Sequence, residues 1–311
     1  MPTPDWWQTD PRAPLTIGPR SFPGRIWTAS GCFGYGLNGF DLTSVEYPSV
    51  YDGLGVVVTK TVTPAARIGN PMPRLCELAT GALNSIGLEN LGLAEFLDRI
   101  VPELGRREVP FVVSLAATRP EQFSELVTQV SWAAADLPQW HGVELNLSCP
   151  NVAEGGHDFG SDPDTVTRCV EAARPHLPDR ALIAKVTPNV ARIAPLAAAA
   201  REGGADAVAA INTVVGLEID LDTGRPALPR RYGGYSGPGI LPIALAKIDE
   251  IVREVDIPVI GVGGIATAED ALKFFALGVV AVQVGTAQMR DPFTVARIAA
   301  ELSSANDDAS G

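Results

Sequence analysis

The chain has 311 residues, 46% of them hydrophobic and 19% charged, which suits a soluble globular protein with a full apolar core. Its formal net charge of -12 argues against a nucleic-acid partner, because such binding relies on clustered Lys and Arg. No secretory signal and no apolar run of membrane-spanning length is present in the sequence. The four cysteines are scattered, which favours a cytoplasmic location and argues against an iron–sulfur cluster on this chain.

Eight short apolar runs rich in Val and Ile recur along the chain. They are near-continuously apolar rather than alternating, as expected for parallel strands buried on both faces. In chain order the expected strands are residues 26–30, 55–60, 111–115, 143–147, 182–186, 207–212, 258–262 and 280–284.

Amphipathic segments of helical length separate most of these strands. The clearest are residues 120–137, 162–177, 241–255 and 267–278. Thr267 is placed to cap the last of them and Gly278 to end it. The alternation predicts an α/β protein with a single-domain (β/α)₈ TIM barrel, and a doubly wound open sheet is the alternative. We expect an N-terminal extension over 1–25, the barrel over 26–305 and a disordered tail over 306–311.

Polar residues gather where the expected strands end. In barrels of this type the active site lies at the carboxyl ends of the strands and in the loops that follow. A barrel built for stability alone has no reason to collect lysines and amides at one rim. The residues in these positions are Ser30, Thr59, Lys60, Ser114, Asn146, Ser148, Cys149, Lys185, Asn212, Thr213, Gly263, Gly264, Gly285 and Thr286.

Two glycine-rich segments follow the last two strands, "GVGGIATAED" (261–270) and "VGTAQM" (284–289). Glycine lets backbone N–H groups approach an anion, and a helix N-terminus adds a favourable dipole. The loops after strands seven and eight are the usual phosphate site of a barrel. A ligand with a phosphate is therefore predicted, with ordinary tight turns as the alternative.

Cys149 stands at the junction of a strand and a glycine-rich loop, "NVAEGGHDFG" (151–160). A nucleophile would require a histidine base, and a metal site would require further ligands nearby, so no metal site is predicted. A thiol beside a loop typical of a lid suits proton transfer. Lys60 and Lys185 close apolar strands, which indicates an anionic ligand, although Lys185 also suits the Schiff-base chemistry of an aldolase.

Seven motifs together resemble the class 1 dihydroorotate dehydrogenases, most closely the subclass (1B) that passes electrons to an NAD-linked partner subunit. The motifs are "ASGCFGYG", "VTKTVTPAARIGNPMPR", "NSIGLEN", "ELNLSCPNV", "GGYSGPGILPIAL", "GVGGIATAEDAL" and "AVQVGT". The resemblance runs from about residue 26 to 295. It implies an FMN-binding (β/α)₈ barrel that oxidises dihydroorotate to orotate in the synthesis of UMP.

The resemblance also implies individual roles. Cys149 matches the general base that removes a proton from C5 of dihydroorotate while hydride leaves C6 for the flavin, and Lys60 matches a second catalytic residue between flavin and substrate. The positions that match substrate contacts are Lys60, Asn84, Ile86, Gly87, Leu88, Asn146, Asn151, Asn212 and Thr213.

The positions that match FMN contacts come from the ends of most strands. They are Ala29, Ser30, Gly31, Thr59, Lys60, Ser114, Asn146, Lys185, Ile211, Ser236, Gly237, Gly263, Gly264, Gly285 and Thr286. Ser114 stands where many relatives have Asn, and Lys185 matches the lysine near N1 and O2 of the flavin.

The subclass further implies FAD, a 2Fe–2S cluster and NAD on a partner subunit only, within a heterotetramer built on a homodimer. Four other functions remain open. They are a related pyrimidine reductase of the dihydrouracil type, a fumarate-linked dihydroorotate dehydrogenase, a Schiff-base aldolase acting through Lys185, and a non-catalytic flavin- or phosphate-binding subunit.

Overall fold

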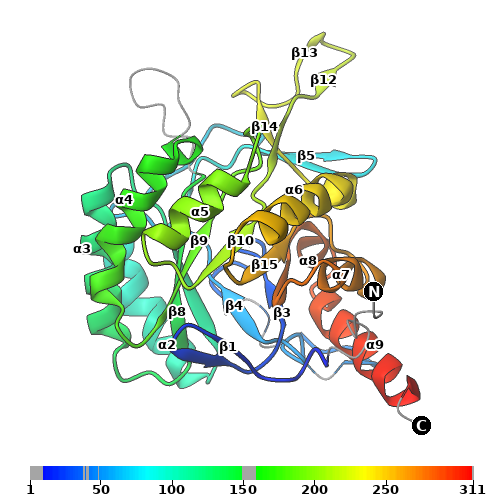
Figure 1. Ribbon diagram of the computed structural model, residues 1–311. Coiled ribbons are helices and arrows are strands. Elements are labelled where there is room, and N and C mark those ends of the chain that lie inside the picture. The colour runs from blue at the N-terminus through cyan, green and yellow to red at the C-terminus, as the bar shows by residue number, and fades with distance from the viewer. Residues whose placement is uncertain (1–9, 38, 40–41, 48, 149–158, 310–311) are drawn as a thin grey trace.

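A computed structural model describes residues 10–309 apart from 38, 40–41, 48 and 149–158. At its centre eight parallel strands form a closed barrel (Figure 1), which confirms the predicted (β/α)₈ fold and the approximate position of every strand. The strands are β3 (Ile26–Thr28), β4 (Val56–Val58), β7 (Phe111–Leu115), β8 (Trp140–Asn146), β9 (Ala181–Lys185), β10 (Ala207–Ala210), β15 (Val259–Val262) and β16 (Ala281–Val284).

The strands follow one another around the barrel in chain order, and β16 pairs with β3 to close it. In the closing pair Val284 lies opposite Thr28. A doubly wound sheet would leave two edge strands, so the alternative architecture is excluded. Because all eight strands are parallel, their carboxyl ends meet on one face, as the sequence analysis requires.

Helices surround the barrel (Figure 1). Their bounds are α1 (Leu93–Glu95), α2 (Val101–Arg106), α3 (Pro120–Ala134), α4 (Pro163–Ala173), α5 (Ala194–Glu202), α6 (Leu241–Glu254), α7 (Ala268–Ala276), α8 (Thr286–Arg290) and α9 (Thr294–Ala309). Thr267 caps α7 as predicted, in a capping box with Asp270. Helix α9 continues into the stretch 306–311 that was expected to be a tail. Among the helices of the described residues, none combines the length and apolar character needed to cross a bilayer.

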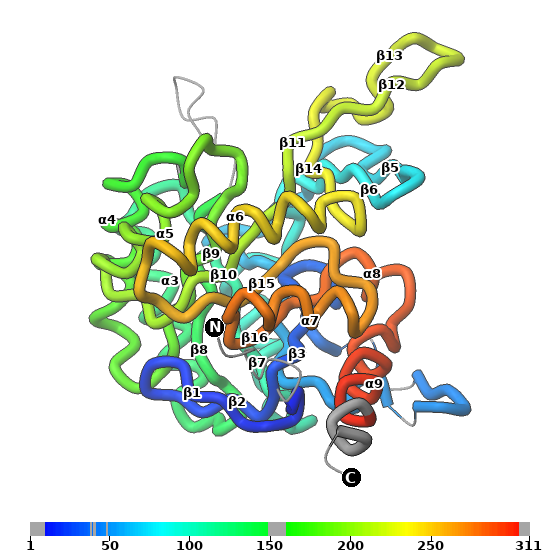
Figure 2. The backbone as a smooth tube through the Cα atoms, turned by 45° about the vertical axis from the view of Figure 1, so that its right-hand side comes forward, coloured from blue at the N-terminus to red at the C-terminus, as the bar shows by residue number. Residues whose placement is uncertain are grey.

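A short hairpin closes the amino end of the barrel (Figure 2). Its strands are β1 (Leu15–Ile17) and β2 (Arg20–Phe22), which pair in antiparallel fashion. Leu15, Ile17 and Phe22 are buried in the same apolar cluster as inward-facing residues of the barrel strands. Residues 15–22 were expected in an N-terminal extension, and the structure makes them part of the barrel's core.

A second sheet stands over the carboxyl end and was not anticipated from the sequence. Its four antiparallel strands are β11 (Val214–Gly216), β14 (Gly233–Ser236), β6 (Gly81–Asn84) and β5 (Leu75–Leu78), in that spatial order. A further hairpin, β12 (Ile219–Asp220) with β13 (Arg225–Pro226), projects beyond this sheet (Figures 1 and 2). The sheet brings two loops that are far apart in the sequence to the rim of the barrel.

Candidate functional site

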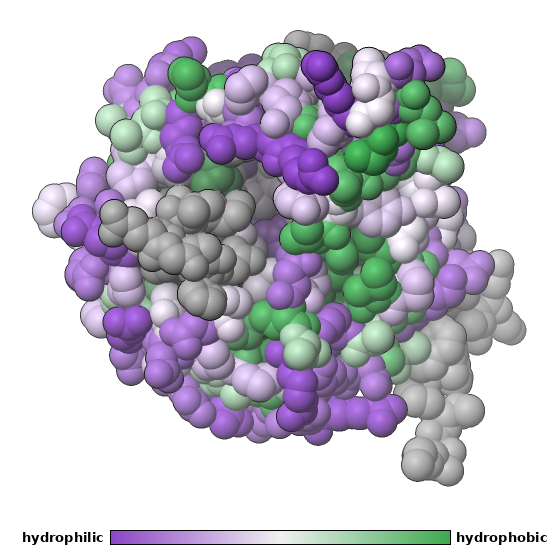
Figure 3. All heavy atoms as spheres, turned by 90° about the horizontal axis from the view of Figure 1, so that it is seen from above, coloured by the Kyte–Doolittle hydropathy of each residue, from purple (hydrophilic) through white to green (hydrophobic). Residues whose placement is uncertain are grey.

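Inside the barrel, side chains change from apolar to polar toward the carboxyl end. Towards the amino end the interior is filled by apolar residues such as Trp27, Val56 and Ile183. Lys185 stands two positions after Ile183 on β9, and Glu144 on β8 and Gln283 on β16 adjoin it; all three side chains are buried. Figure 3 looks onto this end and shows a hollow near its centre. Polar groups so deep in a barrel need partners or a ligand, because an unpaired buried polar group is destabilising.

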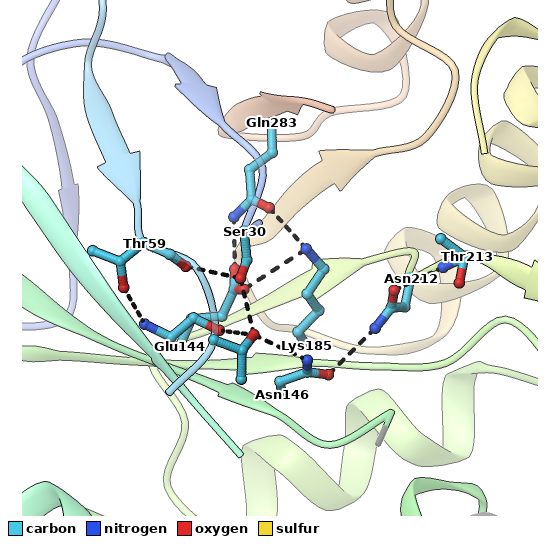
Figure 4. Close-up of polar contacts among 10 residues, drawn as sticks. Ser30, Thr59, Glu144, Asn146, Lys185, Asn212, Thr213 and Gln283 are labelled. Carbon is cyan, nitrogen blue, oxygen red and sulfur yellow. Dashed lines mark hydrogen bonds and ion pairs between the residues drawn. The ribbon is translucent and has the colours of Figure 1, made fainter. Parts of the chain in front are cut away.

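Hydroxyl groups from three neighbouring strands form one side of the site (Figure 4). The Ser30 hydroxyl donates to the backbone oxygen of Thr59 at 2.9 Å and is hydrogen-bonded to Thr61 at 3.0 Å. Thr61 Oγ1 is in turn 2.9 Å from Ser114 Oγ. Ser30, Thr59 and Ser114, predicted separately, therefore lie together, and Thr61 links them.

Amide groups continue this network. Asn146 Nδ2 donates to Thr61 Oγ1 at 3.2 Å, and Asn212 Nδ2 donates to Asn146 Oδ1 at 3.3 Å. The backbone N–H of Thr213 donates to Asn212 Oδ1 at 2.8 Å. Because each amide both donates and accepts, the two asparagines are fixed in orientation, with polar atoms available to a ligand.

The added sheet carries Asn84 toward the same end. Asn84 Nδ2 donates to the backbone oxygen of Gly234 at 3.0 Å. Gly234 lies directly against Thr213, since a Cβ built on this glycine would approach Thr213 Oγ1 to 2.2 Å. Three of the four predicted substrate asparagines, Asn84, Asn146 and Asn212, are thus connected by way of Gly234 of β14 and Thr213. These residues are far apart in the sequence, and no local pattern relates them.

Glu144 and Gln283 are two site residues that the sequence analysis missed. Gln283 Nε2 donates to Glu144 Oε2 at 2.7 Å, and Lys185 Nζ donates to Gln283 Oε1 at 3.3 Å. Lys185 is thereby held inside the barrel, where only 5% of it is exposed. A signal was present, since Glu144 and Gln283 each interrupt an otherwise apolar strand, as Lys185 does.

The glycine-rich segments form the opposite side of the site. Gly263 and Gly264 have φ angles of 129° and 82°, and a Cβ on Gly264 would come within 2.7 Å of the backbone of Leu241, the first residue of α6. Thr286 Oγ1 donates to Ser236 Oγ at 2.8 Å. Glycine is required here because φ is positive and the loop after β15 lies close against the first residue of α6. The N-terminus of that helix presents backbone N–H groups, which favour an anion.

Of two further glycines of the predicted FMN set, Gly31 borders open space and Gly285 has room for a Cβ in ordinary contact. A Cβ built on Gly31 would meet nothing within 4 Å, and one on Gly285 would meet only the side chains of Cys32 and Ala29, at 3.5 and 3.6 Å. Burial raises the pKa of the Cys32 thiol, and the charge of Lys185 opposes this rise. The carboxyl end thus combines free volume with hydroxyl, ammonium and backbone donors, which fits a ligand with a phosphate and a polar ring system.

The loop after β6 lies at the outer edge of this end. Leu88 borders a cavity of about 200 Å³ together with Thr63 and Thr118. The backbone oxygen of Ile86 accepts a hydrogen bond from the backbone N–H of Asn70. Gly87, with a φ of 75°, turns the chain at this point. None of these contacts joins the loop to Asn146.

Of the two predicted catalytic residues, the structure describes Lys60. Lys60 is half-buried, and its backbone N–H donates to the oxygen of Gly34 at 2.8 Å. Cys149 and Asn151 lie outside the described residues. Within the residues that the structure does describe, no group of three or more His, Cys, Asp and Glu side chains is arranged to bind a metal ion.

Comparison with known proteins gives one consistent family. Residues 15–305 match the family model described as dihydroorotate dehydrogenase. The dihydroorotate dehydrogenase B (NAD(+)) catalytic subunit of Geobacillus kaustophilus is 42% identical over 285 residues, which is 91% of this chain and 87% of that protein. The subunit of the same name from Bacillus caldolyticus is 43% identical over 290 residues, with the same two coverages.

A solved structure supports the fold. The dihydroorotate dehydrogenase of Eimeria tenella, in complex with ferulenol, superposes with a TM-score of 0.74. The match covers 97% of this chain and 86% of the other, at 22% sequence identity. At that identity the likeness bears on the barrel alone.

Proposed function

The chain belongs to the dihydroorotate dehydrogenase family, and from this premise we propose that it oxidises dihydroorotate to orotate in pyrimidine synthesis. The observation that carries the proposal is the continuous polar network at the carboxyl end, from Ser30 through Thr61 and Asn146 to Asn212. A planar ring with alternating N–H and C=O groups requires partners that both donate and accept. Neutral amides meet this requirement without adding charge.

Cys149 is the general base in this proposal, and it removes the proton at C5 of dihydroorotate. A free thiol has a pKa near 8.5, so the reaction would accelerate as the pH rises toward that value unless bound substrate alters it. Asn84, Asn146, Asn151 and Asn212 hold the ring and the carboxylate, and Lys60 stands between substrate and cofactor. The loop residues Ile86, Gly87 and Leu88 complete the substrate contacts.

FMN is the cofactor that this site would hold, and when bound it supplies the two-electron acceptor for the hydrogen at C6 of the substrate. Ser236, Thr286 and the glycine-rich loops after β15 and β16 would hold its phosphate. Lys185 would lie near N1 and O2 of the ring, because an ammonium there stabilises negative charge. The open space at Gly31 supports this fit.

The final electron acceptor is NAD in this proposal, reached through FAD and a 2Fe–2S cluster on a separate subunit. The names of the relatives, which describe an NAD(+)-linked catalytic subunit, support a complex of this kind. We further propose that two copies of this chain form the core of the assembly and that it works in the cytoplasm. Fumarate as acceptor is the competing possibility.

The test is an anaerobic absorption spectrum of the purified protein before and after dihydroorotate is added. We expect a yellow protein that dihydroorotate bleaches. Cys149→Ala should stay yellow but bleach slower by a factor of about 10²–10⁴, the usual contribution of a general base. Cys76→Ala is the matched control, because this thiol lies on β5 of the outer sheet and should be dispensable.

The opposite outcomes are informative. A colourless protein that borohydride traps on a carbonyl substrate would indicate the aldolase. A yellow protein bleached by dihydrouracil but not by dihydroorotate would indicate a related pyrimidine reductase. Flavin that no dihydropyrimidine bleaches would indicate a non-catalytic subunit.

A further inference from the structure

Three buried polar side chains form a separate group beneath the proposed ligand site (Figure 4). Glu144 comes from β8, Lys185 from β9 and Gln283 from β16, so the group joins strands on different sides of the barrel. Glu144 and Gln283 have no exposed surface. Apolar side chains of the barrel interior precede two members of the group, Ile183 before Lys185 on β9 and Ala281 before Gln283 on β16.

Gln283 connects the two charged members. Its amide N–H faces the carboxylate of Glu144 at 2.7 Å, and its amide oxygen faces the ammonium of Lys185 at 3.3 Å. A carboxylate can only accept hydrogen bonds and an ammonium can only donate them. The orientation of the amide therefore matches an ionised Glu144 and a charged Lys185, and it keeps both side chains in place.

The second carboxylate oxygen of Glu144 is the least satisfied atom of the group. Oε1 is buried and accepts no hydrogen bond from the described residues. The ammonium of Lys185 lies 3.7 Å away from it, an ion pair without direct hydrogen-bond contact. Leaving a carboxylate oxygen without a donor is unfavourable. Hydrogen bonds within the group therefore do not neutralise Glu144 fully, and its negative charge remains directed at the ammonium of Lys185.

We propose that Glu144 is a positioning residue that acts on bound FMN through Lys185. The inference rests on the proposed function, because it requires FMN beside Lys185. The reduced isoalloxazine ring carries negative charge, so the ammonium stabilises the reduced cofactor more than the oxidised one. Glu144 opposes this effect at close range in a buried setting, where Coulomb interactions are strong. It thereby lowers the reduction potential of FMN, while Gln283 fixes the distance.

The test is the midpoint potential of FMN in wild-type protein and in Glu144→Gln, measured by anaerobic photoreduction against a reference dye. This readout needs neither dihydroorotate nor turnover. Glu144→Gln keeps the shape and removes the charge, so we expect the affinity for reduced over oxidised FMN to rise about tenfold. For a two-electron couple that is about 30 mV more positive. Lys185→Gln should shift the potential the other way.

Two further variants make the result decisive. Glu144→Asp keeps the charge but withdraws it from Lys185, so it should give a smaller shift of the same sign and serves if Glu144→Gln does not fold. Asp206→Asn is the matched control, because Asp206 pairs with Arg174 at 2.7 Å at the start of the neighbouring strand β10. It should lower stability and leave the potential unchanged.

The outcomes separate this inference from the proposed function. A wild-type protein without flavin would contradict the proposed function. A yellow wild type, with Glu144 variants whose potential is unchanged or more negative, would overturn the role of Glu144 alone. A positive shift in Glu144→Gln that Asp206→Asn does not reproduce would support it.

Discussion

The two ends of the barrel use the same eight strands for different purposes. At the amino end Phe22 of the closing hairpin stacks on Trp27 and on His141, with ring centroids 4.8 and 5.0 Å apart. At the carboxyl end the interior positions carry hydroxyl, amide and charged groups, and Glu144 Oε1 lacks a hydrogen-bond donor among the described residues. The comparison teaches that stability and chemistry are assigned to opposite ends of each strand.

Several polar groups at the amino end bond to protein atoms, although Nε of Arg20 and of Arg180 are buried without a hydrogen-bond partner among the described residues. Arg20 donates to the backbone oxygen of Pro138 at 2.6 Å, and His141 Nδ1 is hydrogen-bonded to the oxygen of Ser21 at 2.9 Å. Asp206 accepts from Arg174 at 2.7 Å and from the backbone of Leu182 at 2.8 Å. These contacts hold the hairpin and the strand ends, so we expect variants here to change stability and leave the chemistry intact.

The largest effect should come from Phe22→Ala. This side chain has no exposed surface and fills the amino end of the barrel. Its truncation should lower the free energy of unfolding by about 3–5 kcal/mol, measured by denaturant titration, because it leaves a cavity. The FMN content of the folded fraction should stay unchanged. Lost FMN binding at temperatures where the variant is folded would break the division between the two ends.

Asn212→Ala tests the opposite end. It removes a donor to Asn146 and an acceptor for the Thr213 backbone. We expect kcat/KM for dihydroorotate to fall at least about a hundredfold, as for other preorganised donors, with a change in stability of about 1 kcal/mol. Asn189→Ala is the control, since Asn189 bonds the backbone of Thr213 and Val215 instead. Equal losses of activity in both variants would contradict a direct substrate contact.

The pH dependence of stability should trace to the amino end. Burial, then the charge of Arg20, lowers the pKa of His141 from 6.5 to about 4. The unfolded chain therefore binds a proton that the folded protein refuses between these values, so stability is full above about pH 6.5 and declines as the pH falls toward 4. The loss should be on the order of 2 kcal/mol.

The variant that checks this dependence is His141→Asn, whose amide can still donate to Ser21. Thermal unfolding at several pH values should show a shallower decline for this variant than for wild type. Ser131→Ala, which removes a hydrogen bond to the backbone oxygen of His176 and no titratable group, is the control and should keep the wild-type slope. Parallel curves for wild type and His141→Asn would refute the assignment.

The smallest effect should come from Ser114→Ala. This variant tests whether a hydroxyl of the carboxyl-end site also contributes to stability. Ser114 Oγ is hydrogen-bonded to Thr61 at 2.9 Å within the site. Its removal should lower stability by about 1 kcal/mol, measured as a shift in the denaturant midpoint. Ser303→Ala, which removes only a bond to the backbone of its own helix α9, should be close to neutral. A neutral Ser114→Ala would mean that the network adds nothing to folding.

Much of the fold was predictable because its signals are local. Eight apolar runs indicated eight strands, and Thr267 indicated the start of a helix by its capping chemistry. The sheet of β5, β6, β11 and β14 was not predicted. Its pairs join residues such as Asn84 and Gly234, which are distant in the sequence, and each strand is only three or four residues long.

The site divides in the same way. The sequence alone determined that polar residues end the strands. In a parallel barrel all those ends lie on one face, so these residues could be predicted to share a site. Only the tertiary structure decided which of them meet. Glu144 and Gln283 each interrupt an apolar strand, but the sequence does not show that they meet, because their contact depends on the register with which the barrel closes. That register is set by all eight strand pairs together, so no single segment of sequence contains it.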